Sequence, residues 1–386
     1  MELRFARPDE KSTIIEMWQY CFSDKEPFLS WYFDNKYTNE NTLVGVVEGK
    51  LVCSLQMLPY KLNFHGESVD VCYIVGVATL PEARGKGYMD QLLRKSIEIL
   101  DDRGHGITIL LPFRYDFYRK YGWETCFWHK EYALEISELK PLRKRYGTIK
   151  RLDTENEMEL VSEIYDRFIK DKNGSILRSN KDWQCLFADF SFEEARSYLL
   201  LNELGIAEGY IIFSIKDDLV NIFDMAYVHY KAYRGLMDFI YMHGAQAKKV
   251  IWKAPSDDMM LSYLDNPKEG VALKPLTMVR IVNAEKVFSL LCMQCYEIVD
   301  IIIKIEDDFA QWNTGIFRIS KGNVKKLESD EAELVCSIQT LSLLAMGAMS
   351  IEEAHKAGFV QIESKRTLME AGKLFKKKIN YMNDYY

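Results

Sequence analysis

The chain has 386 residues, 48% of them hydrophobic and 13% aromatic, which is enough for two or three domains with cores of their own and argues against disorder. Its net charge of −7 argues against a general binder of nucleic acid or of anionic membranes, because both need a basic surface. No apolar run approaches the ~20 residues that span a bilayer, and the chain does not open on a signal-peptide core, so we expect a cytoplasmic protein.

The eight cysteines are scattered, and in the cytoplasm they would be reduced. Cys292 and Cys295 form a C-x-x-C pair, but no second pair or His-x-x-x-His follows, and Leu290, Leu291 and Met293 beside them look like helix core. The six histidines do not cluster. We therefore predict no metal site.

The first predicted elements are a short strand at residues 3–6 and two helical stretches. Pro8 and the acids after it are typical of a helix start. The second helical stretch, near residues 28–33, is rich in aromatic residues, among them Trp31. Two hairpins follow, the first over residues 43–57.

A strand, a glycine-rich basic loop and a helix come next, and the rest of the chain is organised around them. Residues 71–79 are β-branched and apolar, as in a buried strand, and Leu80-Pro81 ends it because proline cannot donate to a ladder. The loop Arg84-Gly85-Lys86-Gly87 follows. After the loop, small and apolar residues recur at the spacing of an amphipathic helix: Met89, Leu92, Leu93, Ser96, Ile97 and Leu100.

This loop suits a diphosphate. The free N–H groups and the positive end of the macrodipole at a helix start favour anions. Gly85 and Gly87 let the backbone come close to phosphate oxygens and adopt positive φ. The loop is not a Walker loop, since no Gly-Lys-Ser/Thr ends it, and it lacks the full Gly-x-Gly-x-x-Gly dinucleotide spacing. By itself, the same sequence also fits an ordinary strand–turn–helix connection.

The next strand, residues 107–111, stops at Pro112, and the aromatic segment Phe117-Tyr118-Arg119-Lys120-Tyr121-Gly122-Trp123 follows. The run from residue 73 to residue 123 resembles the core of the GCN5-related N-acetyltransferases (GNAT). In that family, an Arg-x-x-Gly-x-Gly/Ala loop after a splayed strand holds acetyl-CoA, and a segment ending in Gly-Phe closes the site. Arg84, Gly85, Gly87 and the aromatic segment match this pattern, with tryptophan in the last aromatic place.

The resemblance implies acetyl-CoA as the cosubstrate and assigns its contacts. The splayed strand would pair with the pantetheine arm, the loop amides would hold the pyrophosphate, and a backbone N–H near Val77 would stabilise the oxyanion. The residues so implied are Val77, Ala78 and Thr79 on the strand, Arg84, Gly85, Lys86, Gly87, Tyr88, Met89 and Asp90 on the loop and helix, and Phe113 and Arg114 at the thioester end.

A second α/β unit is predicted from Gly147 to about Pro275. Its order of helices and strands echoes the first, and Tyr233-Arg234-Gly235-Leu236 stands where the phosphate loop would be. The second glycine and the lysine are missing there. We interpret this unit as a degenerate copy that has lost cofactor binding and serves as scaffold.

From about Asn283 the pattern changes. A strand is expected at residues 334–339, a capping box opens a helix at Ser350, and a basic helix is expected at residues 365–378. The three-part order is similar to the Eis-type (enhanced intracellular survival) acetyltransferases, which join two GNAT-like domains to a C-terminal domain resembling sterol carrier proteins.

The predicted fold class is therefore α/β (α+β), with two GNAT-like mixed-sheet domains, the second degenerate, and a sterol-carrier-protein-like α+β domain. The expected boundaries are residues 1–146 for the catalytic domain, residues 147–282 for the degenerate copy, and residues 283–386 for the third domain, which ends in the catalytic C-terminus.

Acetyl transfer to an amine needs a base for the ammonium and an acid for the departing thiolate. Tyr118 stands where the resemblance places the acid, and a phenol with a pKa of ~10 keeps its proton at pH 7. A packing role for Tyr118, or Tyr121 as the acid, is the alternative. In Eis-type enzymes the C-terminal carboxylate is the base, and here it belongs to Tyr386. Burial near acids such as Asp384 would raise its pKa towards neutrality, whereas a frayed tail is the other reading.

The resemblance also implies an acceptor site walled by the first two helices. Asp24, Glu26 and Trp31 are candidates for binding a cationic amine of aminoglycoside, polyamine or lysine type, although both acids also fit a solvated loop. We expect no nucleic-acid or membrane partner, and the resemblance implies a ring-like homo-oligomer, a hexamer. The alternative function is a non-catalytic lipid- or protein-binding module on a fossil acetyltransferase scaffold, and a CoA enzyme of another class is a third.

Overall fold

The computed structural model describes residues 1–267, 269–362 and 364–385. They fall into two units. Of these described residues, the first unit contains those in 1–127 and 276–378 together with Asp384 and Tyr385, and the second contains those in 128–275 and 379–383. Each unit contains residues from both sides of a predicted domain boundary. The reason is that strands near these boundaries belong to sheets whose other strands come from distant parts of the sequence.

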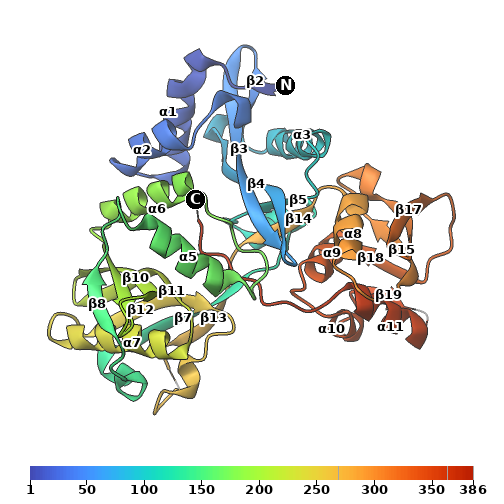
Figure 1. The fold of residues 1–386 in the computed structure, drawn as a ribbon. Coiled ribbons are helices and arrows are strands. Elements are labelled where there is room, and N and C mark those ends of the chain that lie inside the picture. Colours follow the sequence, from blue (N-terminus) through green and yellow to red (C-terminus); the bar gives the residue numbers. More distant parts are fainter. Residues whose placement is uncertain (268, 363, 386) are drawn as a thin grey trace. The chain divides into compact units, whose positions relative to one another are not determined.

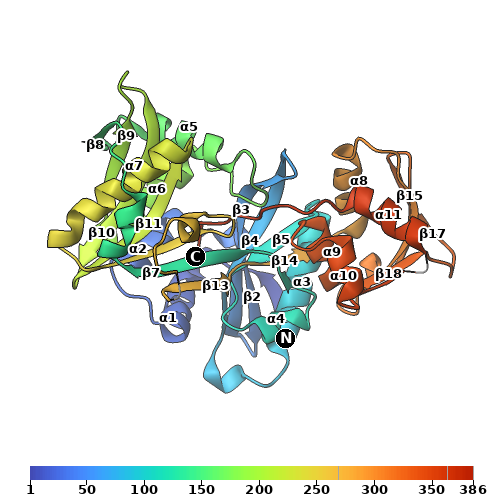
Figure 2. The same ribbon diagram turned by 90° about the horizontal axis from the view of Figure 1, so that it is seen from below.

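The first unit is built on a mixed sheet of seven strands in the order β1-β2-β3-β4-β5-β14-β6. Its one parallel pair in the described register is β4 with β5. The strands are β1 (Glu2–Phe5), β2 (Thr42–Val47), β3 (Lys50–Phe64), β4 (Glu67–Thr79), β5 (Ile107–Leu110), β14 (Met278–Ile281) and β6 (Glu124–Thr125). Although β14 follows the second unit in sequence, it lies beside β5 in both ribbon views (Figure 1, Figure 2).

Helices cover both faces of this sheet. Helices α1 (Lys11–Phe22) and α2 (Phe28–Asn35) lie on one side and α3 (Tyr88–Asp102) on the other (Figure 1). The predicted apolar stripe of α3 packs on the sheet, since Leu92, Leu93, Ser96, Ile97 and Leu100 are buried. Burying one such aliphatic side chain contributes about 1.5–3 kcal/mol, so the stripe fixes the helix and the loop before it.

The second unit has its own mixed sheet, in the order β13-β7-β12-β11-β10-β9-β8. From β8 to β12 it repeats the element order from β1 to β5, as the sequence predicted. Its strands are β7 (Trp128–Glu135), β8 (Thr148–Arg151), β9 (Arg196–Leu201), β10 (Ala207–Lys216), β11 (Leu219–Tyr227), β12 (Lys249–Pro255) and β13 (Val271–Pro275). Its helices are α5 (Met158–Ile169), α6 (Asn180–Phe192) and α7 (Tyr230–Tyr241).

The third domain, drawn orange to red in Figure 2, belongs to the first unit and has a sheet in the order β17-β16-β15-β18-β19. Its strands are β15 (Asp300–Glu306), β16 (Gly315–Ser320), β17 (Asn323–Leu327), β18 (Leu334–Ser337) and β19 (Val360–Ile362). Its helices are α8 (Ala284–Met293), α9 (Ile338–Ala345), α10 (Ile351–Lys356) and α11 (Lys365–Leu374).

Two element ends differ from the sequence prediction. The strand expected at residues 334–339 ends at Ser337, because that side chain caps α9 by accepting a hydrogen bond from the Thr340 N–H. The basic helix expected at residues 365–378 ends at Leu374, where Phe375 leaves the helical region with φ −98° and ψ 80°. The capping box of α10 is confirmed.

The C-x-x-C pair spans the end of α8, and the Cys295 thiol lies 3.4 Å from the carbonyl oxygens of Glu297 and Lys373. No three His, Cys, Asp or Glu side chains are grouped to hold a metal ion in the part of the chain that the structure describes. In that same part, no helix combines the length and the apolar character needed to cross a membrane.

Candidate active site

Strand β4 bends at Gly76. In the register with β3 the pairing shifts between Ser54 and Gln56, so that Gly76 and Val77 together face one residue, which is a β-bulge. Gly76 has φ +60°, and a Cβ on it would lie 2.3 Å from the ring of Trp18. Only glycine therefore fits at the bend.

Strand β4 pairs with β5 over a short stretch and then separates from it. Their parallel pairing covers Cys72 and Tyr73 of β4, and in the described residues it does not continue over residues 74–79. Because backbone N–H and C=O groups need partners, this edge can accept an extended ligand as an added strand. Val77, Ala78 and Thr79 lie on it.

The loop after β4 enters α3 without a side-chain cap. Gly87 is the N-cap residue, and no side chain of the described residues accepts a hydrogen bond from the first turn. Gly85 and Gly87 have φ of +75° and +74°, and a Cβ on either would meet no heavy atom within 4 Å. The start of α3 thus presents free N–H groups to open space, an arrangement that binds phosphate oxygens.

Arg84 adds positive charge beside this loop. Its Nε donates to the carbonyl oxygen of Thr79 at 3.2 Å, and its guanidinium lies 6.0 Å from the ring centre of Tyr20. These contacts hold the side chain between the end of β4 and the end of α1. An anion at the start of α3 would therefore meet a cation held in place.

These elements border a cavity of about 650 Å³, which is in the size range of small-molecule sites. The predicted cofactor contacts in its lining are Val77, Ala78, Thr79, Arg84, Gly85, Gly87, Tyr88, Met89, Asp90 and Phe113. Two others do not reach the described lining: Lys86 is exposed, and Arg114 pairs with Asp116 at 2.6 Å. Cys21, Phe22 and Ala83 also line the cavity, and nothing in the sequence predicted them. Phe117, Lys120 and Tyr121 complete the lining; they belong to the aromatic segment that the resemblance places at the site, but no contact with the cofactor was predicted for them.

Lys120 is a cation on the wall of this cavity. Its Nζ lies 4.6 Å from the ring centres of both Phe117 and Tyr121. No carboxylate of the described residues pairs with Lys120, and a cation–π contact at an exposed site contributes only about 0.5–1 kcal/mol. The charge of Lys120 is therefore free to meet an anion. The signal was present in the sequence, because Lys120 stands between aromatic residues in the closing segment.

Tyr118, the predicted acid, lies on α4 (Tyr115–Arg119) and is buried at 3% exposure. Its ring centre lies 5.7 Å from that of Phe113, which lines the cavity, and 6.1 Å from that of Trp123. Burial raises the pKa of its hydroxyl above the ordinary tyrosine value. Tyr121, the alternative acid, belongs to the cavity lining, whereas Tyr118 does not line the cavity and packs against Phe113, which does.

Asp24 contacts the bent strand β4 indirectly, through Trp18. Its Oδ2 accepts a hydrogen bond of 2.8 Å from the indole N–H of Trp18, and the same indole covers Gly76. The other carboxylate oxygen of Asp24 has no hydrogen-bond partner among the described residues. The Trp18 indole therefore lies between the bulge of β4 and a carboxylate that keeps one oxygen free.

The other acceptor candidates support α2 itself. Glu26 Oε2 accepts a hydrogen bond of 3.2 Å from the Ser30 N–H, and the ring of Trp31 packs 5.7 Å from that of Phe28. Both contacts suit a structural role. Of the two terminal candidates, Asp384 belongs to the first unit, and Tyr386 lies outside the described residues.

The segment before them is fixed on the second unit. The Tyr381 N–H donates to the carbonyl oxygen of Asn173 at 3.0 Å. The Asn383 side chain donates to Asp224 Oδ1 at 2.8 Å, and Asp224 pairs with the fully buried Arg178 at 2.7 Å. Residues 379–383 are therefore docked rather than frayed.

In the second unit, the corresponding helix α7 begins with a side-chain cap instead of an open start. His229 caps α7, with Nδ1 accepting a hydrogen bond of 3.1 Å from the Ala232 N–H, so a protein side chain takes the place of an anion. The buried ring of Tyr233, in the first turn, lies 4.8 Å from Tyr227 and 6.1 Å from Trp252. Aromatic side chains fill the space beside this helix start, which supports the interpretation of a degenerate copy.

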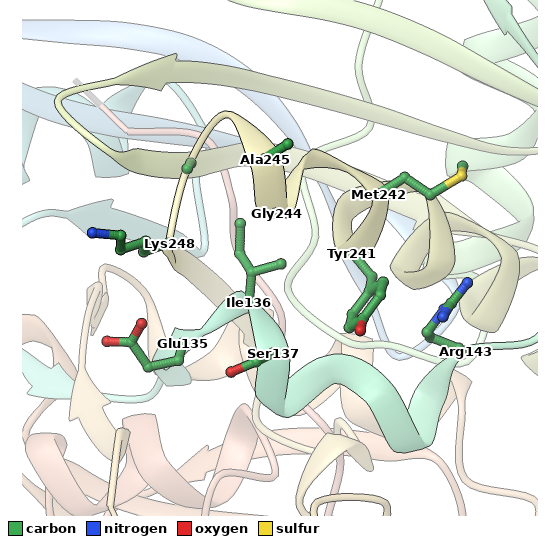
Figure 3. A pocket seen from close by; sticks show the side chains of 10 residues that line it. Glu135, Ile136, Ser137, Arg143, Tyr241, Met242, Gly244, Ala245 and Lys248 are labelled. Atoms are coloured by element: carbon green, nitrogen blue, oxygen red, sulfur yellow. The ribbon is translucent and has the colours of Figure 1, made fainter.

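The second unit has another cavity, of about 470 Å³, near the end of α7 (Figure 3). Figure 3 shows Tyr241 beside Arg143, and the guanidinium carbon lies 4.3 Å from the ring centre. Arg143 Nε is paired with Asp238 at 2.8 Å. Because its charged group is already bound and no predicted site residue belongs to the described lining, we assign no chemistry to this cavity.

Comparisons with known proteins identify all three parts. Models of an acetyltransferase (GNAT) domain match residues 2–126 and residues 174–281, and a model of a sterol carrier protein domain matches residues 288–383. A curated relative, an uncharacterized N-acetyltransferase of Streptomyces avermitilis, is 22% identical over 150 residues. That match covers 37% of this chain and spans only 36% of the relative.

Solved structures share the fold over the whole chain. A probable N-acyltransferase of Enterococcus faecalis has a TM-score of 0.89 at 23% identity, with 100% of this chain and 99% of that chain covered. Eis1 of Mycobacterium abscessus has a TM-score of 0.81 at 18% identity, with 100% of both chains covered. A GCN5-related N-acetyltransferase from Anabaena variabilis has a TM-score of 0.86 at 22% identity, again with 100% of both chains covered.

The matched domains define the class: the chain contains two GNAT acetyltransferase domains, and this fold implies acetyl-CoA or another acyl-CoA as cosubstrate. More narrowly, two GNAT domains followed by a sterol carrier protein domain make up the Eis-type architecture, so the resemblance stated from the sequence is confirmed.

Proposed function

We propose that this chain transfers an acetyl group from acetyl-CoA to a primary amine of a cationic acceptor, of aminoglycoside, polyamine or lysine type. The cavity between the open edge of β4 and the uncapped start of α3 carries the proposal. A strand edge suits the amide groups of a pantetheine arm, and the start of α3 suits a diphosphate. Arg84 and Lys120 supply cations on two parts of the lining.

Acetyl-CoA, when bound, supplies an activated acetyl group as a thioester. The edge formed by Val77, Ala78 and Thr79 would hold its arm, and the loop with Gly85 and Gly87 would hold its phosphates. The open space above both glycines, where even a Cβ would meet nothing, supports this fit. A backbone N–H near Val77 would stabilise the oxyanion of the tetrahedral intermediate.

Tyr118 is the proposed acid for the departing thiolate. Its raised pKa means that the hydroxyl keeps its proton throughout the neutral range, which a proton donor needs. Its position behind Phe113 requires a small adjustment of that exposed ring for direct contact with the thioester. Phe113 is 68% exposed, so such an adjustment meets little packing resistance.

Asp24 is the proposed anchor for the cationic acceptor, because its indole-bound carboxylate keeps one oxygen free for an ammonium group. The proposed base is the C-terminal carboxylate of Tyr386, and this role rests on the family resemblance. Asn383, three residues before it, is held by a hydrogen bond to Asp224.

A screen of amines with detection of the free CoA thiol tests this function. Acetyl-CoA should be consumed faster with aminoglycosides, polyamines or lysine peptides than with neutral amines or water. Asp24→Asn should raise KM for the amine and leave KM for acetyl-CoA unchanged. Binding of acetyl-CoA without acetylation of any amine would favour the non-catalytic alternative.

A further inference from the structure

The third domain reaches into the core of the catalytic domain through one loop, residues 307–314. Phe309 and Ala310 of this loop are buried in the same hydrophobic cluster as Tyr118, Tyr121 and Trp123. That cluster also contains the apolar face of α3. The loop therefore belongs, by its packing, to the catalytic domain.

Hydrogen bonds fix the base of this loop. Asp307 accepts hydrogen bonds from Arg280 Nη2 at 2.8 and 3.0 Å and from Asn313 Nδ2 at 3.0 Å. Its Oδ1 also accepts from the backbone N–H groups of Phe309 and Ala310, at 3.1 and 3.0 Å. Since Asp307 and Arg280 are fully buried, the loop is held without competition from water.

The ring of Phe309 contacts one residue that lines the cofactor cavity and one residue of helix α3. Its centre lies 5.1 Å from that of Tyr121, which lines the cavity in the closing segment. The guanidinium carbon of Arg94 lies 4.1 Å from the same ring centre, and Arg94 also donates to the Phe309 carbonyl oxygen. Arg94 is on α3, one turn after Asp90, which lines the cavity.

We propose that Phe309 is a positioning residue that sets the distance between the closing segment and the phosphate-binding helix α3. It touches neither substrate nor cofactor. A smaller side chain there would let Tyr121 move back and α3 shift, so the cavity would no longer match acyl-CoA. This inference rests on the proposed function, because it takes acyl-CoA as the occupant of the cavity.

Titration calorimetry of the full chain with acetyl-CoA tests it. Phe309→Leu should weaken acetyl-CoA binding at least about fivefold, because small misplacements of binding groups are costly. The matched control is Phe317→Leu, since Phe317 is also buried in the third domain, packs on Phe288 at 5.4 Å and does not belong to the described cavity lining. Phe317→Leu should lower the melting temperature but change the Kd less than about twofold.

A second pair of variants avoids a folding defect. The side chains of Arg94 and Lys95 are neighbours on α3 and are 41% and 42% exposed. Arg94→Met should weaken acetyl-CoA binding about threefold or more, whereas Lys95→Met should not. Equal Kd values for Phe309→Leu and Phe317→Leu, or for Arg94→Met and Lys95→Met, would overturn the positioning role. Failure of the unaltered chain to bind acetyl-CoA would instead overturn the proposed function.

Discussion

Gly122 lies directly against the buried guanidinium of Arg280, and a Cβ on Gly122 would be 1.7 Å from Arg280 Nη1. Gly122 also has φ +90°, a region that favours glycine. Arg280 comes from β14 and is held by Asp307 of the third domain at 2.8 Å. The glycine of the closing segment is therefore required because this segment crosses an arginine that anchors the third domain.

Gly122→Ala should destabilise the protein by about 3 kcal/mol or more, because the strain of alanine at positive φ and the cost of overpacking against Arg280 add together. Gly66→Ala is the matched control, since Gly66 has φ +100° but open space around it. That control should cost only about 1–2 kcal/mol. Urea unfolding of both variants measures the difference, and equal losses would show that the contact with Arg280 does not matter.

A chain of residues 1–146 alone should not fold. It lacks β14, which lies between β5 and β6, and it lacks Phe309 and Ala310 of the hydrophobic cluster. Circular dichroism should show no cooperative melting, and acetyl-CoA should not change the spectrum. A cooperative transition in this short chain would contradict the view that the third domain completes the catalytic core.

Tyr118→Phe should lower kcat at least about tenfold, because general acid catalysis typically contributes that much or more. The raised pKa of Tyr118 predicts that the unaltered enzyme keeps its acid protonated as pH rises through the ordinary tyrosine value. The rate should therefore show no loss of the acid form between pH 7 and about 10. Tyr121→Phe serves as the comparison, and a larger loss there than for Tyr118→Phe would move the role to Tyr121.

Removal of Tyr386, or extension of the chain beyond it, should abolish turnover and leave acetyl-CoA binding intact. The reason is that only the position of the terminal carboxylate changes, while the docked residues 379–383 keep their contacts. Steady-state rates and calorimetry on the same samples separate the two effects. Turnover that survives an extension would assign the base elsewhere.

Local patterns were enough to predict much of this molecule. The strand, loop and helix around Gly85 and Gly87 follow from proline punctuation, paired glycines and a clear helical stripe, and the structure has all three. The repeated element order in the second unit was also visible in the sequence. Both rest on interactions between residues close in the chain.

What the sequence could not provide comes from long-range packing. Arg280 and Phe309 carry no motif, and their roles arise because β14 and the loop 307–314 pack against elements more than a hundred residues earlier. The side-chain cap that replaces a phosphate site at His229 is likewise seen only in three dimensions. The aromatic segment was recognisable in the sequence, but that Lys120 within it lines the cavity is seen only in the structure.

The central claim is that the backbone at the start of α3 binds the diphosphate of acetyl-CoA, and calorimetry of Gly87→Ala against Gly49→Ala tests it most directly. Both glycines have positive φ, +74° and +77°, with no atoms near a Cβ, so their costs in stability should match. The unaltered chain and Gly49→Ala should bind acetyl-CoA equally, and Gly87→Ala should bind it at least about tenfold more weakly. Equal binding by all three, or no binding by the unaltered chain, would contradict the central claim.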